Sequence, residues 1–362
     1  TLEDVFAVQD EIASTIVNTL RATWLADLVE PAPRRYTDSV AAYGLYLRGR
    51  YAWNLRTQEG VAEAIRFFEQ AIAEDPQYAL AYTGLADSYA LHVDYRSVAV
   101  HEGFARAKEY ALQALALDET LAEAHASLAW SLFIYDWDWD AASREFRRAI
   151  ELNPRYATAH QWYAFLLTVQ GRADQALVEA HTAQDLDPAS VSGLRGLALQ
   201  YYYARQYDRA RYHLGRAIEM NPTAEESYRI LGLTLVVAGR LEEAERVLRE
   251  AAAMQGAGAL TLGTLGLALG RAGRTDEARA IRAGLEQDAQ RGYVSPVAFA
   301  MLAIGLDELD EAIDWAERSY DDRRGWMVYS GVNPLFDPLR GHPRFEALRA
   351  RFGLPSVVRP GS

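Results

Sequence analysis

Residues 225–254 read EESYRILGLTLVVAGRLEEAERVLREAAAM. Apolar residues recur three and four positions apart on both sides of AGR at 238–240, a pattern that predicts two amphipathic helices joined by a tight turn. Gly239 suits the position just after the first helix, where the backbone often adopts a positive φ. The stretch therefore predicts a helical hairpin.

The hairpin pattern recurs when the sequence is shifted against itself by 34 residues. One column holds alanine, and another holds proline after Asn or Asp, where a helix ends because the residue before proline avoids the helical conformation. Two more columns hold a large residue and a small one. The columns comprise Ala142, Ala176, Ala210, Ala244, Ala278 and Ala312; Pro154, Pro188 and Pro222; Tyr163, Leu197, Leu231, Leu265 and Phe299; Ala164, Ala198, Gly232, Gly266 and Ala300.

This motif resembles the tetratricopeptide repeat (TPR). In one unit the pattern is carried by Tyr228, Leu231, Gly232, Leu235, Ala244, Leu248 and Ala251. The resemblance implies an all-α fold, a right-handed TPR superhelical solenoid of about eight helical hairpins with N- and C-terminal capping segments. No hairpin can bury its apolar face alone, so stacking must supply the core.

The repeat register predicts the organisation of the chain. Residues 39–320 form the TPR array, with units near 44, 79, 122, 157, 191, 225, 259 and 293. Residues 1–30 read as an amphipathic N-terminal helix, 31–38 as a linker and 321–362 as an irregular C-terminal cap. Because the chain begins at Thr1, we expect a fragment of a longer protein.

A closer resemblance is carried by four stretches, DVFAVQDEIASTIVNTL (4–20), YLRGRYAWNLRTQEG (46–60), YDWDWDAASREFRRAIELNPRYATAHQWYA (135–164) and FDPLRGHPRFEALRARFGLP (336–355). Together they look like a group of bacterial signalling proteins that carry these repeats at the C-terminus. Such proteins commonly have a winged-helix regulator, a serine/threonine kinase or a nucleotide cyclase upstream. The resemblance implies a regulatory region, and the absence of cysteine fits a cytoplasmic protein.

Composition narrows the classes of function. The chain has no cysteine, which excludes disulfides and cysteine-ligated zinc. The net charge of −13 argues against nucleic-acid binding by this region, because phosphates require basic patches. No apolar stretch is long enough to predict a membrane span.

No catalytic constellation is visible, so we expect no enzyme activity, no cofactor and no metal in this region. His125 and His160 occupy equivalent positions in consecutive units and could share a metal or a proton. Two histidines alone make a poor metal site, so the favoured interpretation is that each fills the large-residue position of a first helix. The stretch GLALGRAG at 266–273 superficially resembles a phosphate loop, but it lies inside a repeat helix and lacks the G-K-[ST] ending.

The TPR resemblance implies that first helices line a concave groove. Its inward positions gather aromatic residues and one arginine, the residue types that dominate interface energetics. The predicted partner-binding residues are Trp130, Phe133, Phe165, Tyr202, Tyr203 and Arg195. The resemblance also shows that the terminal-carboxylate clamp of chaperone-binding repeats is absent, because its Asn site is occupied by Asp87, Trp130, Phe165, Leu199, Leu233 and Leu267.

Three uses of the groove stay open. The leading hypothesis is a non-enzymatic scaffold that binds a protein or peptide segment. The alternatives are a self-association module, a possible homodimer that pairs upstream output domains, and a small-molecule sensor. A simpler interpretation is that several of these aromatic residues are core between neighbouring repeats.

The stretch YDWDWD at 135–140 suggests a calcium loop, with aspartates at positions one, three and five. Ala141 and Arg147 stand where that loop requires Gly and Glu. The stretch therefore reads as the turn of the third unit, with Asp138 or Asp140 capping the next helix. Trp137 and Trp139 are expected to pack into neighbouring turns, and the sequence leaves open whether they are buried or offered to a partner.

Overall fold

The computed structural model describes residues 36–94, 99–254, 257–323 and 325–353. The helix predicted at 1–30 lies outside the described residues, as does most of the predicted linker. Every regular element of the described part is helical. The elements are α2 (Val40–Asn54), α3 (Gln58–Glu74), α4 (Ala79–Asp94), α5 (Val100–Leu117), α6 (Ala122–Ser131), η1 (Leu132–Asp136), α7 (Trp139–Leu152), α8 (Ala157–Val169), α9 (Ala173–Leu186), α10 (Val191–Tyr203), α11 (Tyr207–Met220), α12 (Glu225–Val237), α13 (Leu241–Ala253), α14 (Ala259–Arg271), α15 (Thr275–Ala289), α16 (Pro296–Gly305), α17 (Leu309–Asp321), η2 (Trp326–Gly331), η3 (Pro334–Leu339) and α18 (Pro343–Ala350).

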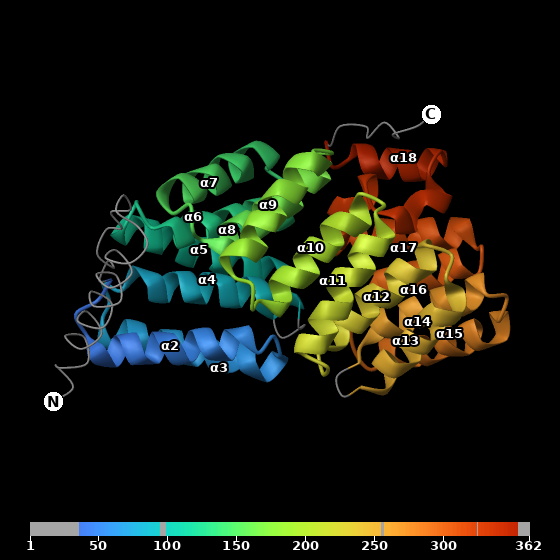
Figure 1. Ribbon diagram of the computed structural model, residues 1–362, viewed down its shortest axis with the longest axis horizontal. Helices are drawn as coiled ribbons and strands as arrows, with labels where there is room; N and C mark the ends of the chain where they lie inside the picture. The colour runs from blue at the N-terminus through green and yellow to red at the C-terminus, as the bar shows by residue number, and fades with distance from the viewer. Residues whose placement is uncertain (1–35, 95–98, 255–256, 324, 354–362) are drawn as a thin grey trace, which may run out of the picture.

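In the described part of the chain, α2 to α17 form eight consecutive antiparallel hairpins, which confirms the predicted fold class. Figure 1 shows the first hairpins, blue to teal, at one end of the long axis and the last hairpins, orange to red, at the other. The first helices of successive hairpins pack against one another, whereas the second helices lie further apart. The first helices therefore form the inner face of the superhelix.

The turns inside the last five hairpins share one geometry. After α8, Gly171 N–H donates to Thr168 O at 2.9 Å and Arg172 N–H to Leu167 O at 2.8 Å. This pair of bonds is a Schellman motif, which needs positive φ at the residue just after the helix. Gly171, Gly239 and Gly273 have φ of 76°, 75° and 79°, as the sequence predicted. Arg205 and Asp307 occupy the same site with φ of 61° and 63°.

The third hairpin absorbs its extra residue in a π-helix, η1, between α6 and the turn. Asp138 N–H donates to Leu132 O at 3.0 Å, and Trp137 takes the left-handed conformation with φ of 60°. A π-helix holds one more residue per turn than an α-helix, so the register of the array continues past the insertion.

Small residues set the spacing of helices, as predicted, but not always within a hairpin. A Cβ at Gly232 would collide with Leu248 of the facing helix α13. In α14, however, Gly263, Gly266 and Gly270 face α16 of the next hairpin. A Cβ at Gly263 would lie 2.7 Å from Ala298 Cα, so the two backbones are in direct contact. The glycine-rich stretch at 266–273 thus belongs to helix packing.

The chain past α17 turns back toward the middle of the array. Leu335, Phe336, Leu339 and Phe345 are almost fully buried, and η2, η3 and α18 all contact α17. In addition, η2 contacts α8, four hairpins earlier. The C-terminal elements therefore lie beside the middle hairpins rather than beyond α15 (Figure 1).

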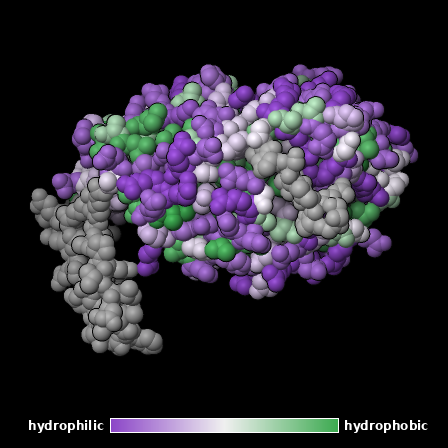
Figure 2. All heavy atoms as spheres, turned by 90° about the horizontal axis from the view of Figure 1, so that it is seen from above, coloured by the Kyte–Doolittle hydropathy of each residue, from purple (hydrophilic) through white to green (hydrophobic). Residues whose placement is uncertain are grey.

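The surface is mainly polar. Hydrophilic side chains predominate on the face shown in Figure 2, between small apolar patches. Among the described helices, none combines the length and apolar character that crossing a membrane requires.

Candidate functional site: the inner face

The predicted site residues lie on the inner face, on α6, η1, α8 and α10, and five of them form one aromatic zone. The aromatic zone consists of Trp130, Phe133, Phe165, Tyr202 and Tyr203. The ring of Trp130 lies 5.6 Å from Phe133 and 6.4 Å from Phe165, and Tyr202 lies 5.3 Å from Tyr203. Trp130, Phe165 and Tyr203 are partly exposed, whereas Phe133 and Tyr202 are 0% and 1% exposed.

The C-terminal segment, defined here as residues 325–340, covers the aromatic zone. The Tyr329 ring stacks on Tyr203 at 5.2 Å with an interplanar angle of 3°. It also meets Phe133 and Phe165 edge-on, at 6.3 Å each. A single side chain of the segment thus closes over rings from η1, α8 and α10.

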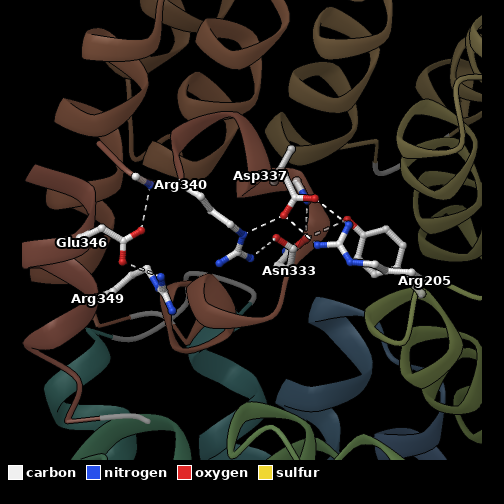
Figure 3. A network of polar contacts seen from close by, with 9 residues as sticks. Arg205, Asn333, Asp337, Arg340, Glu346 and Arg349 are labelled. Carbon is white, nitrogen blue, oxygen red and sulfur yellow. Dashed lines mark hydrogen bonds and ion pairs between the residues drawn. The ribbon is translucent and has the colours of Figure 1, made fainter. Parts of the chain in front are cut away.

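Polar contacts fix the segment beside these rings (Figure 3). Tyr202 Oη donates to Asn333 Oδ1 at 2.8 Å, and both residues are buried. Arg205 binds Asp337 with both terminal nitrogens, at 2.6 and 2.8 Å, while Arg340 Nε approaches the same carboxylate at 2.8 Å. Burial alone raises the pKa of Asp337, but hydrogen bonds from Arg205 and Arg340 outweigh it and lower the pKa of this carboxyl below its usual range.

Charged side chains form a second region of the inner face. The polar zone consists of Arg50, Asp87, Glu123, Ser127, Arg195 and Glu226. Arg50 Nη1 lies 3.2 Å from Asp87 Oδ2, and Ser127 Oγ donates to Asp87 Oδ1 at 2.5 Å. Burial raises the pKa of Asp87, and Arg50 and Ser127 offset part of that effect. Asp87 is thus a buried carboxylate held by two partners from the neighbouring hairpins.

The far side of the polar zone keeps its charges partly open to solvent. Arg195 Nη2 lies 2.9 Å from Glu226 Oε2, and Arg229 lies 3.3 Å from the other oxygen of Glu226. Coulombic attraction to Arg195, with smaller contributions from Arg229 and Arg56, lowers the pKa of Glu226. The Glu226 side chain remains 47% exposed.

Sequence reasoning found the aromatic zone and Arg195 but missed most of the polar zone and the C-terminal segment. Charged residues at inward positions of otherwise apolar first helices, such as Asp87 and Glu226, were a usable signal. The return of residues 325–340 had no local signal, because its contacts join residues more than a hundred positions apart.

The two repeat histidines occupy the large-residue position of first helices. His160 Nδ1 lies 2.5 Å from Glu179 and Nε2 lies 3.0 Å from Pro154 O, and His125 makes the same pair of contacts with Glu145 and Glu119 O. Tyrosine hydroxyls at the equivalent position bond the same carbonyl six residues earlier, Tyr82 to Pro76 and Tyr228 to Pro222. Within the described residues, no three acidic or histidine side chains gather in a way that could hold a metal.

The turn YDWDWD is a joint between the third hairpin and the C-terminal cap. Asp138 Oδ1 accepts from Ala141 N–H at 3.0 Å and caps α7, while Asp136 pairs with Lys108 at 2.5 Å. The Trp137 ring lies 4.8 Å from both Tyr320 and Phe352. Trp139 Nε1 donates to Phe352 O at 2.9 Å. Both tryptophans are half-buried, against the far end of the chain rather than only against neighbouring turns.

Comparison with known proteins agrees with this geometry. A family described as tetratricopeptide repeat matches residues 195–259. The chain is 25% identical over 167 residues to transcriptional regulator HilA of Salmonella typhimurium, and 38% identical over 85 residues to the protein named "Putative adenylate cyclase 3" of Rhizobium meliloti. These segments cover 46% and 24% of this chain, and only 30% and 14% of the relatives. A transcriptional regulator and a cyclase are among the kinds of protein that the sequence resemblance implies.

Two solved structures share the fold over most of the chain. A monomeric mutant of IFIT1 with Gppp-AAAA covers 92% of this chain and 76% of its own, at 16% identity and a TM-score of 0.59. The human IFIT1 dimer with PPP-AAAA covers 85% and 77%, at 17% identity and a TM-score of 0.52. At these identities the likeness concerns the fold alone.

Solenoids of this kind generally present an extended concave surface that binds other proteins. The hairpins, their turn glycines, the matched family and the solved neighbours agree on one assignment. The described part of the chain is therefore an all-α superhelix of the tetratricopeptide repeat type, and residues 195–259 match that repeat family.

Proposed function

We propose that this chain is a non-enzymatic protein–protein interaction scaffold, the partner-binding part of a longer bacterial signalling protein. The partner is an extended or helical protein segment that enters along the inner face. The observation that carries the proposal is the polar zone, where charged side chains of neighbouring hairpins pair along the inner face and Glu226 stays partly open. Glu226 combines 47% exposure of its side chain with three nearby arginines.

The physical argument rests on what such a zone can recognise. A charge that is held in place by neighbours, yet faces solvent, has already lost its side-chain freedom and binds a complementary group at a low entropic cost. Alternating arginine and carboxylate groups select a partner by its charge pattern, because a like charge in the wrong place costs several kcal/mol. The aromatic zone supplies the apolar contacts, so Trp130, Phe133, Phe165, Tyr202 and Tyr203 remain proposed partner contacts together with Arg195.

Site-specific cross-linking in cells tests the proposal. A photoreactive amino acid replaces Glu226 on the inner face, or Glu219, a 72% exposed residue of the second helix α11, as the matched control. We expect a discrete cross-linked protein from position 226 and none from position 219. The partner found is then titrated by calorimetry against Glu226→Arg and Glu219→Arg.

Glu226→Arg places a third positive charge beside Arg195 and Arg229, so we expect about tenfold weaker binding or more, while Glu219→Arg leaves binding unchanged. Equal binding by the two variants would show that the inner face is not the partner site.

The self-association alternative has one observation in its favour. Leu47 and Tyr51 of α2 and the following residue Leu55 are spaced four positions apart and are 47%, 71% and 49% exposed. Light scattering of the chain at high micromolar concentration tests this alternative, with Tyr51→Glu as the variant. A monomer at all concentrations for the unaltered chain argues against the alternative, and a dimer that Tyr51→Glu dissolves supports it.

A further inference from the structure

The C-terminal segment combines two faces with different partners. Its apolar residues Leu335, Phe336 and Leu339 are buried, with Phe336 packed 5.7 Å from Phe345 of α18. Its other face presents Tyr329, Asn333 and Asp337, which are spaced four residues apart. Tyr329 and Asn333 meet the aromatic zone, and Asp337 meets Arg205. Figure 3 shows Asn333, Asp337 and Arg205.

The contacts on that second face are those of a bound ligand. An aromatic ring stacks on an aromatic ring, an amide accepts from a tyrosine hydroxyl, and a carboxylate takes two bonds from one arginine. Stacking and bidentate arginine pairing are the interactions that proteins use to recognise peptides at hot spots. Of the residues contacted, Phe133, Phe165, Tyr202 and Tyr203 are predicted partner contacts, whereas Arg205 lies in the turn after α10.

Two features of the C-terminal segment favour its release from the inner face. Its outer contact stays open to water, with the side chains of Arg205 and Asp337 42% and 32% exposed. Two short 3₁₀ helices, separated by Val332 and Asn333, form its backbone, and such helices have poorer hydrogen-bond geometry than α-helices. By contrast, α18 is an α-helix with two buried apolar residues of its own, Phe345 and Leu348, and it contacts α17.

We propose that residues 325–340 are a built-in competitor for the inner face. The external partner carries the same chemistry, an aromatic residue followed at four and eight positions by an amide and a carboxylate, and binds after it displaces this segment. The inference rests on the proposed function and adds to it the regulation and the kind of partner. Occupation of the site by the segment lowers the apparent affinity for any such partner, because only the fraction of molecules with an open site can bind.

A fluorescent peptide with the sequence of residues 325–340 tests the inference in trans. The receptors are the full chain, the variant Tyr329→Ala/Asp337→Ala, called the loosened variant, and the control Asp314→Ala/Glu317→Ala. The control removes two acids that pair with Arg344 of α18 and that are not part of the aromatic zone. We expect about tenfold tighter binding to the first variant than to the unaltered chain or the control, measured by fluorescence anisotropy.

A second peptide tests the chemistry. The peptide that carries Asp337→Lys should bind the loosened variant about tenfold more weakly, because it meets Arg205 with a like charge. A folded loosened variant that binds the first peptide no better than the unaltered chain overturns the inference.

If the loosened variant does not fold, hydrogen exchange of the unaltered chain decides instead. Amides of residues 326–340 should exchange about tenfold faster or more than those of α10 and α17, since local opening precedes global unfolding. Exchange at the same rate as those helices overturns the inference. An external partner that binds the unaltered chain and the loosened variant equally refutes the inference and leaves the proposed function intact. Tighter peptide binding by the loosened variant, without any cross-link at position 226, refutes the proposed function and supports the competition by the segment.

Discussion

Replacement of Trp137 by alanine tests whether the third hairpin and the C-terminal cap act as one unit. The Trp137 ring touches Tyr320 and Phe352 at 4.8 Å each, and the Arg323 guanidinium lies 4.2 Å above it. Trp137 belongs to the third hairpin, whereas Tyr320, Arg323 and Phe352 belong to the end of the eighth hairpin and to the C-terminal cap. Loss of the ring should therefore weaken the C-terminal cap and the third hairpin together.

The expected cost follows from the contacts. A half-buried indole removes about 100 Å² of apolar surface from water, worth about 2.5 kcal/mol. Each ring pair adds about 0.5 kcal/mol or more, and the cation–π contact adds about 0.5 kcal/mol. Partial relaxation of the site recovers some of this, so we expect Trp137→Ala to lower the free energy of unfolding by about 3 kcal/mol.

Glycine at the same position separates the ring from the backbone. Trp137 has φ of 60°, a conformation that costs an L-residue about 1 kcal/mol. Trp137→Gly should therefore be less destabilising than Trp137→Ala by about 0.5 kcal/mol, after the larger backbone entropy of unfolded glycine. A reversed order would show that the positive φ at position 137 carries no strain that glycine relieves.

Urea unfolding followed by far-UV circular dichroism measures these free energies, and hydrogen exchange locates them. Trp315→Ala is the control, because Trp315 stacks on Phe299 at 4.4 Å inside one hairpin and joins no distant elements. In the Trp137 variant, exchange should accelerate in both α7 and α18, whereas in the control it should accelerate around α16 and α17 alone. A cycle with Phe352→Ala should give a coupling energy of about 1 kcal/mol. A loss below about 0.5 kcal/mol, with no coupling, would refute the reasoning.

Three further predictions concern single sites. His160→Gln should cost more stability at pH 6 than at pH 9. Burial opposes the charged imidazole, but Glu179 and Pro154 O raise the pKa of His160, so its stabilising effect is complete below the ordinary value of about 6.5 and is lost as the pH rises through the raised pKa. Equal losses in thermal melts at both pH values would contradict this. Gly270→Ala should lower the free energy of unfolding by about 2 kcal/mol in urea titrations, because its Cβ would lie 2.5 Å from Gly305 C; a neutral effect would show that α14 and α16 move apart freely. Asp307→Gly should raise the free energy of unfolding by about 0.5 kcal/mol, and with it the melting temperature, because the exposed Asp307 has φ of 63°. A lower melting temperature would argue against strain at that turn.

Local features of the fold were predictable from the sequence. The helix periods, the turn glycines Gly171, Gly239 and Gly273, and the capping role of Asp138 depend on residues a few positions apart, and the structure agrees with each. The interpretation of His125 and His160 as fillers of a repeat position follows from the same register, which places Tyr82 and Tyr228 in equivalent contacts.

Contacts between distant residues were not predictable. Nothing near Tyr329 in the sequence indicates that it stacks on Tyr203, because the superhelix must first bend far enough to bring them together. For the same reason the sequence left the exposure of Trp137 and Trp139 open. The aromatic residues at inward positions were recognised by type, but their present partner is a segment of the same chain.

The joint at Trp139 and Phe352 also limits how this protein can change in length. An open array can gain or lose a hairpin by recombination, since each unit touches only its neighbours. Here the turn at 137–140 must meet residue 352, so a unit inserted or deleted between α8 and α17 would carry the chain end out of register with both Trp139 and Tyr203. The number of units between these points is therefore under geometric constraint, and relatives that keep the joint should keep the count.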